Sequence, residues 1–362
     1  MVRDNMTLED QQGYRGHVTW ISGESDGRER DTLATIDPAG FYIRPPPNPH
    51  ELDGEITDDS DLFQTIHMGA AVVNEDEWRL VVDGLVERPF AIDFAQLKAM
   101  HKMTITSFHE CYGSPIAPPT KALWRIGNVR WTGVRLADLL RLAQPKSEVT
   151  HVWSWGLDHG TFAGASADRY EKDLTLEKAR APEVLIAYEM NEQPLGKKRG
   201  GPVRLVVPGW FGTNSTKWLC RLSLQSCRAS GPFTTRFYNE IDPTDTAGRR
   251  LRPVWAVEPN SMIVRPKPGD VLVQRSRLEV WGRTWGCEEV VKVDVSVDGG
   301  QSWISAVVTP RKEFEWQLYR CEVALDKRGS WQLLVRATDK TGVSQPLTGR
   351  RNHVHTVDVE VI

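Results

Sequence analysis

The chain has 362 residues, of which 40% are hydrophobic and 26% charged, a composition typical of a soluble globular protein with room for two compact domains. Its 45 basic and 48 acidic residues give a formal net charge of −3, which excludes a global field favouring nucleic acid or an anionic membrane. No apolar run is long enough to span a bilayer, and the N-terminus lacks the hydrophobic segment of a secretory signal. We expect a cytoplasmic protein, or a periplasmic one if an export signal has been removed.

The chain begins with an irregular stretch and then becomes globular. Residues 1–60 are rich in charge and proline, as in IRPPPNPHELDGEITDDSD, and are expected to wrap around a domain as an irregular N-terminal extension. Beyond them, Leu80, Val81 and Val82 predict a strand, and DG a turn. FAQLKAM predicts a short helix, and KMTITSF a second strand that leads into HECYG.

GVRLADLLRLAQP predicts an amphipathic helix. Its apolar residues recur at the i, i+3, i+4, i+7 spacing of one helix face: Leu136, Leu139, Leu140 and Ala143. Pro145 then ends the helix. Further on, GGPVRLVVPGW indicates a buried strand that is bounded by glycine and proline at each end.

The sequence changes character near residue 250, where we place a domain boundary between residues 61–250 and 251–362. In VVKVDVSVDGGQSW the valines alternate with polar residues, which predicts one strand face made of Val291, Val293, Val295 and Val297. SWQLLVRATDKTG repeats the alternation. Short alternating strands with turn signals between them predict an immunoglobulin-like β-sandwich in this second domain.

The five cysteines are odd in number and widely spaced: Cys111, Cys220, Cys227, Cys287 and Cys321. No CxxC occurs, so the pattern supports neither a zinc ribbon nor a dithiol redox pair, and most of these thiols are expected to be buried hydrophobes. Cys111 stands apart because HECYGSP follows a β-run and enters a loop, where sites tend to be built on a rigid scaffold. On residues alone, a plain core position remains the alternative for Cys111.

A second cluster is basic and rich in glycine. KKRGGPVR and WFGTNSTKW gather cationic and short polar side chains: Lys197, Lys198, Arg199, Arg204, Thr213, Asn214, Ser215, Thr216 and Lys217. Glycines let backbone N–H groups approach a ligand closely, and arginines bind phosphate oxygens, so the cluster suits a phosphate. A solvated basic loop is the alternative interpretation. The chain has no GxSxG, HExxH, GxGxxG or GxxxxGK[ST] motif that would indicate another chemistry.

Four blocks follow one another along the chain: WRIGNVRWTGVRLADLL, EVLIAYEMNEQPL, GGPVRLVVPGWFGTNSTKWL and VVKVDVSVDGGQSW. Together they resemble the sulfite oxidase family of molybdopterin-dependent oxidoreductases, which also includes nitrate reductases and sulfane dehydrogenases. The resemblance implies an α+β fold, with a mixed α/β molybdopterin-binding catalytic domain over residues 61–250 and an immunoglobulin-like dimerisation domain over 251–362. It also implies molybdenum–molybdopterin as cofactor, with the metal on one pyranopterin dithiolene.

The resemblance further implies the site residues. Cys111 falls on the family's metal-ligating cysteine, and its thiolate is a soft ligand suited to a metal already bound by two dithiolene sulfurs. Tyr238 falls on the active-site tyrosine near the metal. The positions that match cofactor contacts are His67, Asp158, Arg199, Arg204, Thr213, Asn214, Ser215 and Lys217. Among them Arg204 and Lys217 match the phosphate-binding positions, whereas Arg199 stands where the family often has histidine.

The departures from the family pattern concern the substrate. The family's CxGN becomes CYGS, and the arginine pair that commonly follows is absent, with Pro115 and Ile116 near that place. Two further family arginines are replaced by Ile66 and Glu288. Sulfite oxidases gather several arginines around a doubly charged oxyanion, so we expect a substrate less anionic than sulfite here. The arginines that could compensate from elsewhere are Arg125, Arg169 and Arg236.

We therefore expect a molybdenum-cofactor-dependent oxidoreductase that transfers an oxygen atom at Mo to a sulfur-containing substrate other than sulfite. The alternatives are a nitrate or sulfoxide reductase, and a non-enzymatic cofactor-binding or interaction protein. No haem or flavin domain is evident, so we expect a separate electron-transfer partner, a cytochrome or another carrier. The resemblance also implies a homodimer formed through the C-terminal domain, and neither a nucleic-acid partner nor a membrane span is expected.

Overall fold

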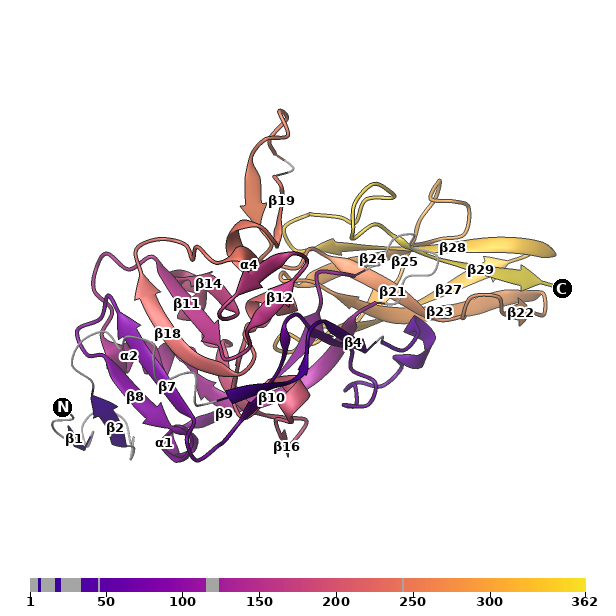
Figure 1. Ribbon diagram of the computed structural model, residues 1–362. Coiled ribbons are helices and arrows are strands. Elements are labelled where there is room, and N and C mark those ends of the chain that lie inside the picture. The colour runs from indigo at the N-terminus through magenta and orange to yellow at the C-terminus, as the bar shows by residue number, and fades with distance from the viewer. Residues whose placement is uncertain (1–5, 8–16, 21–33, 45, 115–123, 243) are drawn as a thin grey trace.

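The computed structural model describes residues 6–7, 17–20, 34–44, 46–114, 124–242 and 244–362. They form a larger mixed part and an elongated β-sandwich that begins with strand β21 and extends to one side of it (Figure 1). Pro115 and Ile116, where the family's arginine pair is missing, lie outside the described residues. None of the described helices combines the length and the apolar character that crossing a membrane requires.

The larger part is organised around a mixed seven-stranded sheet with the order β1-β2-β8-β7-β18-β11-β14. Strands β7 and β18 run parallel at its centre, and the other neighbours are antiparallel. Its strands are β1 (Met6–Thr7), β2 (His17–Trp20), β7 (Arg79–Gly84), β8 (Phe90–Asp93), β11 (His151–Gly156), β14 (Glu171–Thr175) and β18 (Leu219–Gln225). Strand β7 confirms the strand predicted at residues 80–82.

A second sheet lies beside the first and carries the predicted HECYG segment at the end of one strand. Its order is β16-β15-β10-β9, with β17 paired to β15. Its strands are β9 (Lys102–Glu110), β10 (Ile126–Arg135), β15 (Leu185–Met190), β16 (Gln193–Pro194) and β17 (Arg204–Val206). Strand β9 confirms the predicted KMTITSF strand, and Cys111 follows directly after it.

Short helices connect these strands. They are α1 (Phe94–Ala99), α2 (Leu136–Ala143), α3 (Leu176–Ala179), α4 (Pro232–Thr235) and the 3₁₀-helices η2 (Pro49–Glu51), η4 (Lys197–Arg199) and η5 (Gly212–Asn214). Helix α2 confirms the predicted amphipathic helix, because all four predicted apolar positions are buried in it. They pack in one core with Leu80 and Val82 of β7, so the helix is held against the central sheet.

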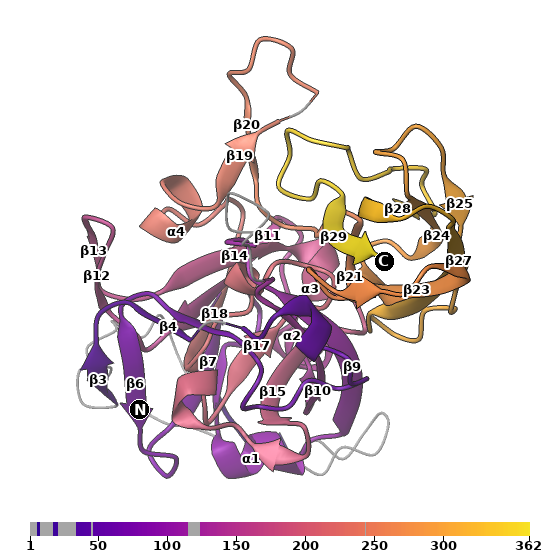
Figure 2. The same ribbon diagram turned by 90° about the vertical axis from the view of Figure 1, so that its right-hand side faces the viewer.

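Small two-stranded sheets complete the larger part. They pair β3 (Ala34–Ala39) with β6 (Gly69–Val73), β4 (Tyr42–Arg44) with β5 (Gln64–Ile66), β12 (Gly160–Phe162) with β13 (Ala165–Ala167), and β19 (Asn239–Ile241) with β20 (Leu251–Pro253). The β19–β20 hairpin projects away from the body (Figure 2). The prediction of an irregular segment over residues 1–60 was wrong for residues 34–44, because most of them pair in β3 and β4 with strands further along the chain.

The C-terminal part is the predicted sandwich of two packed sheets. One sheet has the order β21-β23-β27-β26 and the other β22-β29-β28-β24-β25. Its strands are β21 (Asn260–Arg265), β22 (Val271–Leu272), β23 (Arg275–Trp285), β24 (Val290–Ser296), β25 (Ile304–Ser305), β26 (Val307–Val308), β27 (Gln317–Leu325), β28 (Gly329–Asp339) and β29 (His355–Val361). The valine alternation holds at Val293 and Val295, which are buried in the sandwich core.

The prediction for Val291 was wrong. The register between β24 and β28 shifts between Val290 and Lys292, so Val290 is buried at 1% exposure and Val291 is 56% exposed. An irregularity of this kind inserts a residue into one strand and changes which side chains face the core.

The central β7–β18 pair contains a buried ion pair whose loss should destabilise the protein. Arg221 Nε donates to Asp83 Oδ1 at 3.0 Å, and the two side chains are 11% and 2% exposed. Asp83→Ala would leave a buried guanidinium without its counter-charge, so we expect the free energy of unfolding to fall by about 3–5 kcal/mol in urea titrations. Glu322→Ala is the control, because its pair with Arg277 is exposed, and it should change stability by less than about 1 kcal/mol. Equal effects of the two substitutions would contradict this account.

Candidate active site

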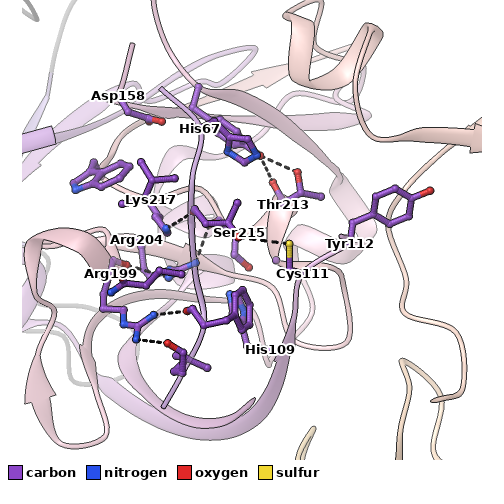
Figure 3. A pocket seen from close by; sticks show the side chains of 18 of the residues that line it. His67, His109, Cys111, Tyr112, Asp158, Arg199, Arg204, Thr213, Ser215 and Lys217 are labelled. Atoms are coloured by element: carbon purple, nitrogen blue, oxygen red, sulfur yellow. Dashed lines mark hydrogen bonds between the residues drawn. The ribbon is translucent and has the colours of Figure 1, made fainter. Parts of the chain in front are cut away.

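One cavity of about 710 Å³ brings together nine of the ten predicted site residues. Strand β5, the end of β9, helix η4, strand β17 and the segment 212–218 all contribute to its lining. The predicted residues at the cavity are His67, Cys111, Asp158, Arg199, Arg204, Thr213, Ser215, Lys217 and Tyr238. In Figure 3, Arg199 and Lys217 lie on one side of this space and Cys111 lies on the other.

Asn214 is the exception among the predicted residues. It does not line the cavity, because its side-chain amide is buried and donates to the carbonyls of Phe211 and Val254, each at 3.0 Å. Val254 in turn donates its backbone N–H to the carbonyl of Tyr238 at 2.9 Å. The prediction of a cofactor contact therefore does not fit Asn214, which ties helix η5 to the segment that holds Tyr238.

Cys111 occupies a half-buried position at the end of strand β9. Its N–H donates to the carbonyl of Arg125 at 2.9 Å, and its carbonyl accepts from the N–H of Ser114 at 3.1 Å. These bonds form a tight turn that turns the chain away from the sheet while the thiol stays at the cavity. None of the five cysteines, all of which lie in the described residues, forms a disulfide, so the Cys111 thiol is free.

Ile66, which stands where the family resemblance places an arginine, is a mostly buried residue of the cavity wall. Ile66 is 2% exposed and packs in a core cluster with Trp155 and Trp218, whereas its neighbour Thr65 has its hydroxyl 3.8 Å from the Cys111 sulfur. Successive side chains of a strand point to opposite faces, so Thr65 is the residue of β5 whose side chain faces the metal-ligand position. The Thr65 hydroxyl therefore lies next to Cys111, while the neighbouring Ile66 supplies no charge at the place of the family's arginine.

Arg199 is held almost entirely by the protein itself. Its guanidinium donates to the carbonyls of Phe63, Asp59 and Leu62 at 2.6, 2.7 and 2.8 Å, and its Nε pairs with the carboxylate of Asp59. Four of the five N–H donors of the side chain are thereby used. Arg199 anchors the segment 59–63 at the cavity and adds positive charge there, with little capacity left to bind a ligand directly.

Arg204 is a buried cation and Lys217 a partly buried one, and neither forms an ion pair among the described residues. Arg204 donates to the carbonyls of Arg199 and Ser215, both at 3.0 Å, and Lys217 Nζ donates to the carbonyl of Thr65 at 2.9 Å. Burial lowers the pKa of Arg204 to about 9. Burial, and then the charges of Arg204 and Arg199, lower the pKa of Lys217 to about 7. Carbonyl dipoles alone leave this charge poorly compensated, so the cavity favours an anion.

Tyr238 and His67 form a contact inside the cavity. The phenol oxygen of Tyr238 is in hydrogen-bonding contact with His67 Nε2, and Tyr238 has a backbone φ of 57°, in the left-handed region. Burial lowers the pKa of His67 to about 3, with Lys217 acting in the same direction. Burial raises the pKa of Tyr238, and Cys111 adds to the rise. The pair is therefore a neutral imidazole and a protonated phenol near neutral pH.

Asp158 lies across the cavity from Cys111, and the hydroxyl segment lines the wall between them (Figure 3). Asp158 is 3% exposed, and its Oδ1 has no hydrogen-bond partner. Burial raises its pKa to about 7, against the effect of Lys217. The Thr213 carbonyl accepts from the buried Tyr170 hydroxyl at 2.7 Å, and Ser215 Oγ accepts from the N–H of Val207 at 3.1 Å. An unpartnered buried acceptor in this place suits a ligand that brings its own N–H or O–H donors.

A polar network behind Cys111 was not found from the sequence. Glu110 is fully buried, accepts from Trp285 Nε1 at 2.8 Å and contacts Arg351 at 3.2 Å. Arg351 comes from the C-terminal sandwich and also donates to the carbonyls of Tyr112, at 3.0 Å, and Ser114. A side chain about 240 residues away thus holds the loop that carries Cys111. The segment HECYGSP contains Glu110, but nothing in the neighbouring sequence indicates that Arg351 is its partner.

The residues considered for substrate recognition lie in different places. Glu288 pairs with Lys340 at 2.9 Å and does not line the cavity. Arg169 stacks 4.0 Å above the Trp155 ring, and Arg236 donates to the carbonyls of Ala163 and Gly164. The remaining candidate is Arg125, whose backbone carbonyl is bonded to Cys111 itself.

Comparisons with known proteins agree with this arrangement. Residues 67–233 match the model of the oxidoreductase molybdopterin binding domain, and residues 252–358 match that of the Mo-co oxidoreductase dimerisation domain. The sulfite oxidase of Gallus gallus is 31% identical over 327 residues, which cover 82% of this chain and 70% of that protein. The chain belongs to the sulfite oxidase family.

Other similar proteins extend the comparison within this family. The mitochondrial sulfite oxidase of Mus musculus is 31% identical over 85% of the chain, but the chain spans only 60% of that protein's length. The crystal structure of the sulfane dehydrogenase SoxCD from Paracoccus pantotrophus superposes with a TM-score of 0.74 at 26% identity, covering 93% of this chain and 92% of that chain. The NADH nitrate reductase of Ulva prolifera is 26% identical over 88% of the chain and 41% of its own length.

The side chains at the cavity fit the family's molybdenum–molybdopterin cofactor. The buried Arg204 and the partly buried Lys217 have no carboxylate partner among the described residues, as a phosphate site requires. The unpartnered Oδ1 of Asp158 can accept from a pterin N–H, and the free thiol of Cys111 lies at the other side of the space. Soft thiolate at one side and hard cationic donors at the other match a group with a metal at one end and a phosphate at the other.

The lowered pKa of Lys217 predicts a specific dependence of stability on pH in cofactor-free protein. Its folded pKa of about 7 lies below the ordinary value of 10.5, so between these values the unfolded chain binds more protons than the folded one. The free energy of unfolding should therefore gain up to about 1.4 kcal/mol per pH unit from this residue as pH rises above 7. Urea titrations of protein from a host without the cofactor should show this slope, and Lys217→Met should remove it.

The control for this measurement is Lys327→Met, which removes an exposed lysine and should leave the slope unchanged. Bound cofactor should also flatten the slope, because a phosphate beside Lys217 stabilises the ammonium form and raises its pKa. A slope that is the same in wild type and Lys217→Met would show that Lys217 is not the buried cation described here.

Proposed function

We propose that this chain is a molybdenum-cofactor-dependent oxidoreductase that transfers an oxygen atom at molybdenum to a sulfur-containing substrate other than sulfite. The observation that carries the proposal is a single cavity that holds the Cys111 thiol, the Tyr238 phenol and the unpaired cations Arg204 and Lys217. When bound, the molybdenum cofactor supplies a two-electron redox centre. The protein supplies a thiolate ligand, the charge that binds the phosphate and the groups that face the substrate.

The cofactor-binding roles follow from where each side chain lies. Arg204 and Lys217 bind the phosphate, and Arg199 keeps the segment 59–63 in place beside them. Asp158 accepts from the pterin. Thr213 and Ser215 form the wall next to Arg204, whose guanidinium is bonded to the carbonyl of Ser215. These assignments place the phosphate at the end of the cavity away from Cys111, which ligates the metal.

Tyr238 and His67 have the properties required to hold a proton at the substrate side. A phenol with a raised pKa stays protonated and donates to an oxygen that lies within hydrogen-bonding distance of it. A buried imidazole with a pKa of about 3 stays neutral and orients that phenol. Tyr238 therefore acts as a hydrogen-bond donor at the reacting oxygen, and His67 fixes its direction.

Two partners complete the proposal. The match of residues 252–358 to the dimerisation domain supports a homodimer formed through the sandwich. Each oxygen-atom transfer from water releases two electrons and two protons. We assign the electrons to a separate carrier such as a cytochrome.

Cys111→Ser tests the proposal directly. Wild-type protein from a host that makes the cofactor should contain about one molybdenum per chain, and Cys111→Ser should lose oxidation of sulfur compounds by a factor of at least ~10² because the thiolate ligand is gone. Cys227→Ser, at an exposed cysteine, is the matched control and should keep metal and activity. Wild-type protein that takes up no molybdenum in such a host would refute the proposal.

The claim that sulfite is not the substrate is tested separately. With ferricyanide or cytochrome c as acceptor, sulfite should be oxidised only weakly, and turnover comparable to that of a true sulfite oxidase would contradict it. A reductase is the second candidate, favoured by the similarity to the nitrate reductase of Ulva prolifera. Rapid reoxidation of the reduced protein by nitrate or by a sulfoxide would favour that candidate.

A further inference from the structure

Arg125 lies beside the proposed metal ligand, and the turn after Cys111 is built around it. Its carbonyl accepts from the Cys111 N–H at 2.9 Å, and its own N–H donates to Ser114 Oγ. A Cβ added to Gly113 would lie 2.3 Å from Arg125 Nη1 and 3.7 Å from the Cys111 sulfur. The guanidinium and the thiol therefore flank the same point, and the guanidinium occupies the space that a side chain at residue 113 would need.

Arg125 is not itself among the residues that line the cavity, but its guanidinium lies beside Cys111, which is, and its charge is not neutralised by an ion pair among the described residues. Arg125 takes part in no ion pair within the described residues, and its Nε is buried without a hydrogen-bond partner. Its charge reaches the phenol of Tyr238, where it opposes the rise in pKa that burial and Cys111 cause. An arginine held between a metal ligand and an active-site phenol is well positioned to bind an anionic substrate.

Most other charges near this point are paired, apart from the buried Lys172, whose Nζ lies 5.6 Å from the Tyr238 ring and donates to the carbonyl of Phe233. Glu240 accepts from the Tyr112 hydroxyl at 3.5 Å and pairs with Arg252, whose guanidinium also contacts Glu258 at 3.0 Å. The guanidinium of Arg351 already contacts the carboxylate of Glu110 and donates to carbonyls of the turn that follows Cys111. Arg125 is therefore a guanidinium without an ion pair beside Cys111 among the described residues, which suits a negatively charged ligand.

Aromatic side chains border the same side of the cavity. The Tyr112 and Tyr238 rings lie 6.2 Å apart, and His67 has the edge of Phe162 at 4.7 Å. Phe162 in turn contacts Phe41 at 5.3 Å, and Phe41 is 54% exposed. A row of rings that ends in an exposed phenylalanine offers apolar area to an organic group on the substrate.

We propose that Arg125 is the anion-binding residue of the substrate site and that the substrate is an organic sulfinate, R–SO₂⁻. The inference rests on the proposed function. The two sulfinate oxygens match the bidentate donors of a guanidinium, and R lies against the aromatic row. In the overall reaction R–SO₂⁻ and water give R–SO₃⁻, two protons and two electrons. One S–O bond forms, both O–H bonds of the water break, and the electrons pass to two equivalents of a one-electron acceptor such as ferricyanide.

The first experiment measures binding without turnover. Titration calorimetry of the holoenzyme with benzenesulfonate, the product of benzenesulfinate, should show a dissociation constant that rises roughly 10- to 100-fold in Arg125→Gln and recovers partly in Arg125→Lys. Arg130→Gln is the control, because Arg130 lies five residues further along the chain, in β10, and pairs with Glu192 at the surface. It should bind like wild type. Methyl phenyl sulfone, a neutral analogue, should bind wild type and Arg125→Gln equally.

The second experiment measures benzenesulfinate oxidation with ferricyanide. Wild type should oxidise it faster than sulfite at equal concentration, and Arg125→Gln should raise KM with a smaller change in kcat, while its molybdenum content and circular dichroism match wild type. Benzenesulfonate that binds wild type and Arg125→Gln with equal affinity would overturn the role of Arg125. Arg125-dependent binding without oxidation of benzenesulfinate would overturn the substrate class. If the loaded protein oxidised no sulfur compound at all, the proposed function itself would fail, and the binding result would still decide the role of Arg125.

Discussion

The site depends on two cations, the buried Arg204 and the partly buried Lys217, that have no carboxylate partner in the part of the chain that the structure describes. Burial in protein disfavours charge, and this is why the pKa of Lys217 falls to about 7. The fold tolerates the cost because backbone carbonyls from β5, η4 and the segment after η5 converge on both side chains. Elements from distant parts of the chain thus meet around a positive space that suits a phosphate, and a phosphate bound there would set where the other end of the cofactor lies.

The other end is fixed by a second set of contacts, which joins the two parts of the molecule. Arg351 of the sandwich reaches the turn after strand β9, and Trp285 of β23 bonds the buried Glu110 that precedes Cys111. The C-terminal sandwich therefore does more than offer a surface for dimerisation, because it holds the loop of the proposed metal ligand from behind. A buried carboxylate with two donors of this kind is costly to disturb, which favours one loop conformation over others.

Much of the fold could be predicted because local patterns carry it. The periodicity of α2 and the β-runs of β7 and β9 have physical causes within a few residues of sequence. A prediction failed where a small shift changes the face of a strand, as at Val291 beside its irregular register. Asn214 lies between the cavity residues Thr213 and Ser215 in the sequence, but its side-chain amide donates to backbone carbonyls of Phe211 and Val254 and does not line the cavity. The contacts of Arg125 and Arg351 depend on tertiary approach, which a single sequence does not record.

X-ray absorption at the molybdenum edge tests the central claim most directly, because it counts the sulfur atoms bound to the metal. With Cys111 as ligand and one dithiolene, wild-type protein should show three Mo–S contacts, and Cys111→Ser that retains cofactor through Arg204 and Lys217 should show two. The same sulfur count in both proteins would contradict the assignment of Cys111, and with it the orientation that the buried cations impose on the cofactor.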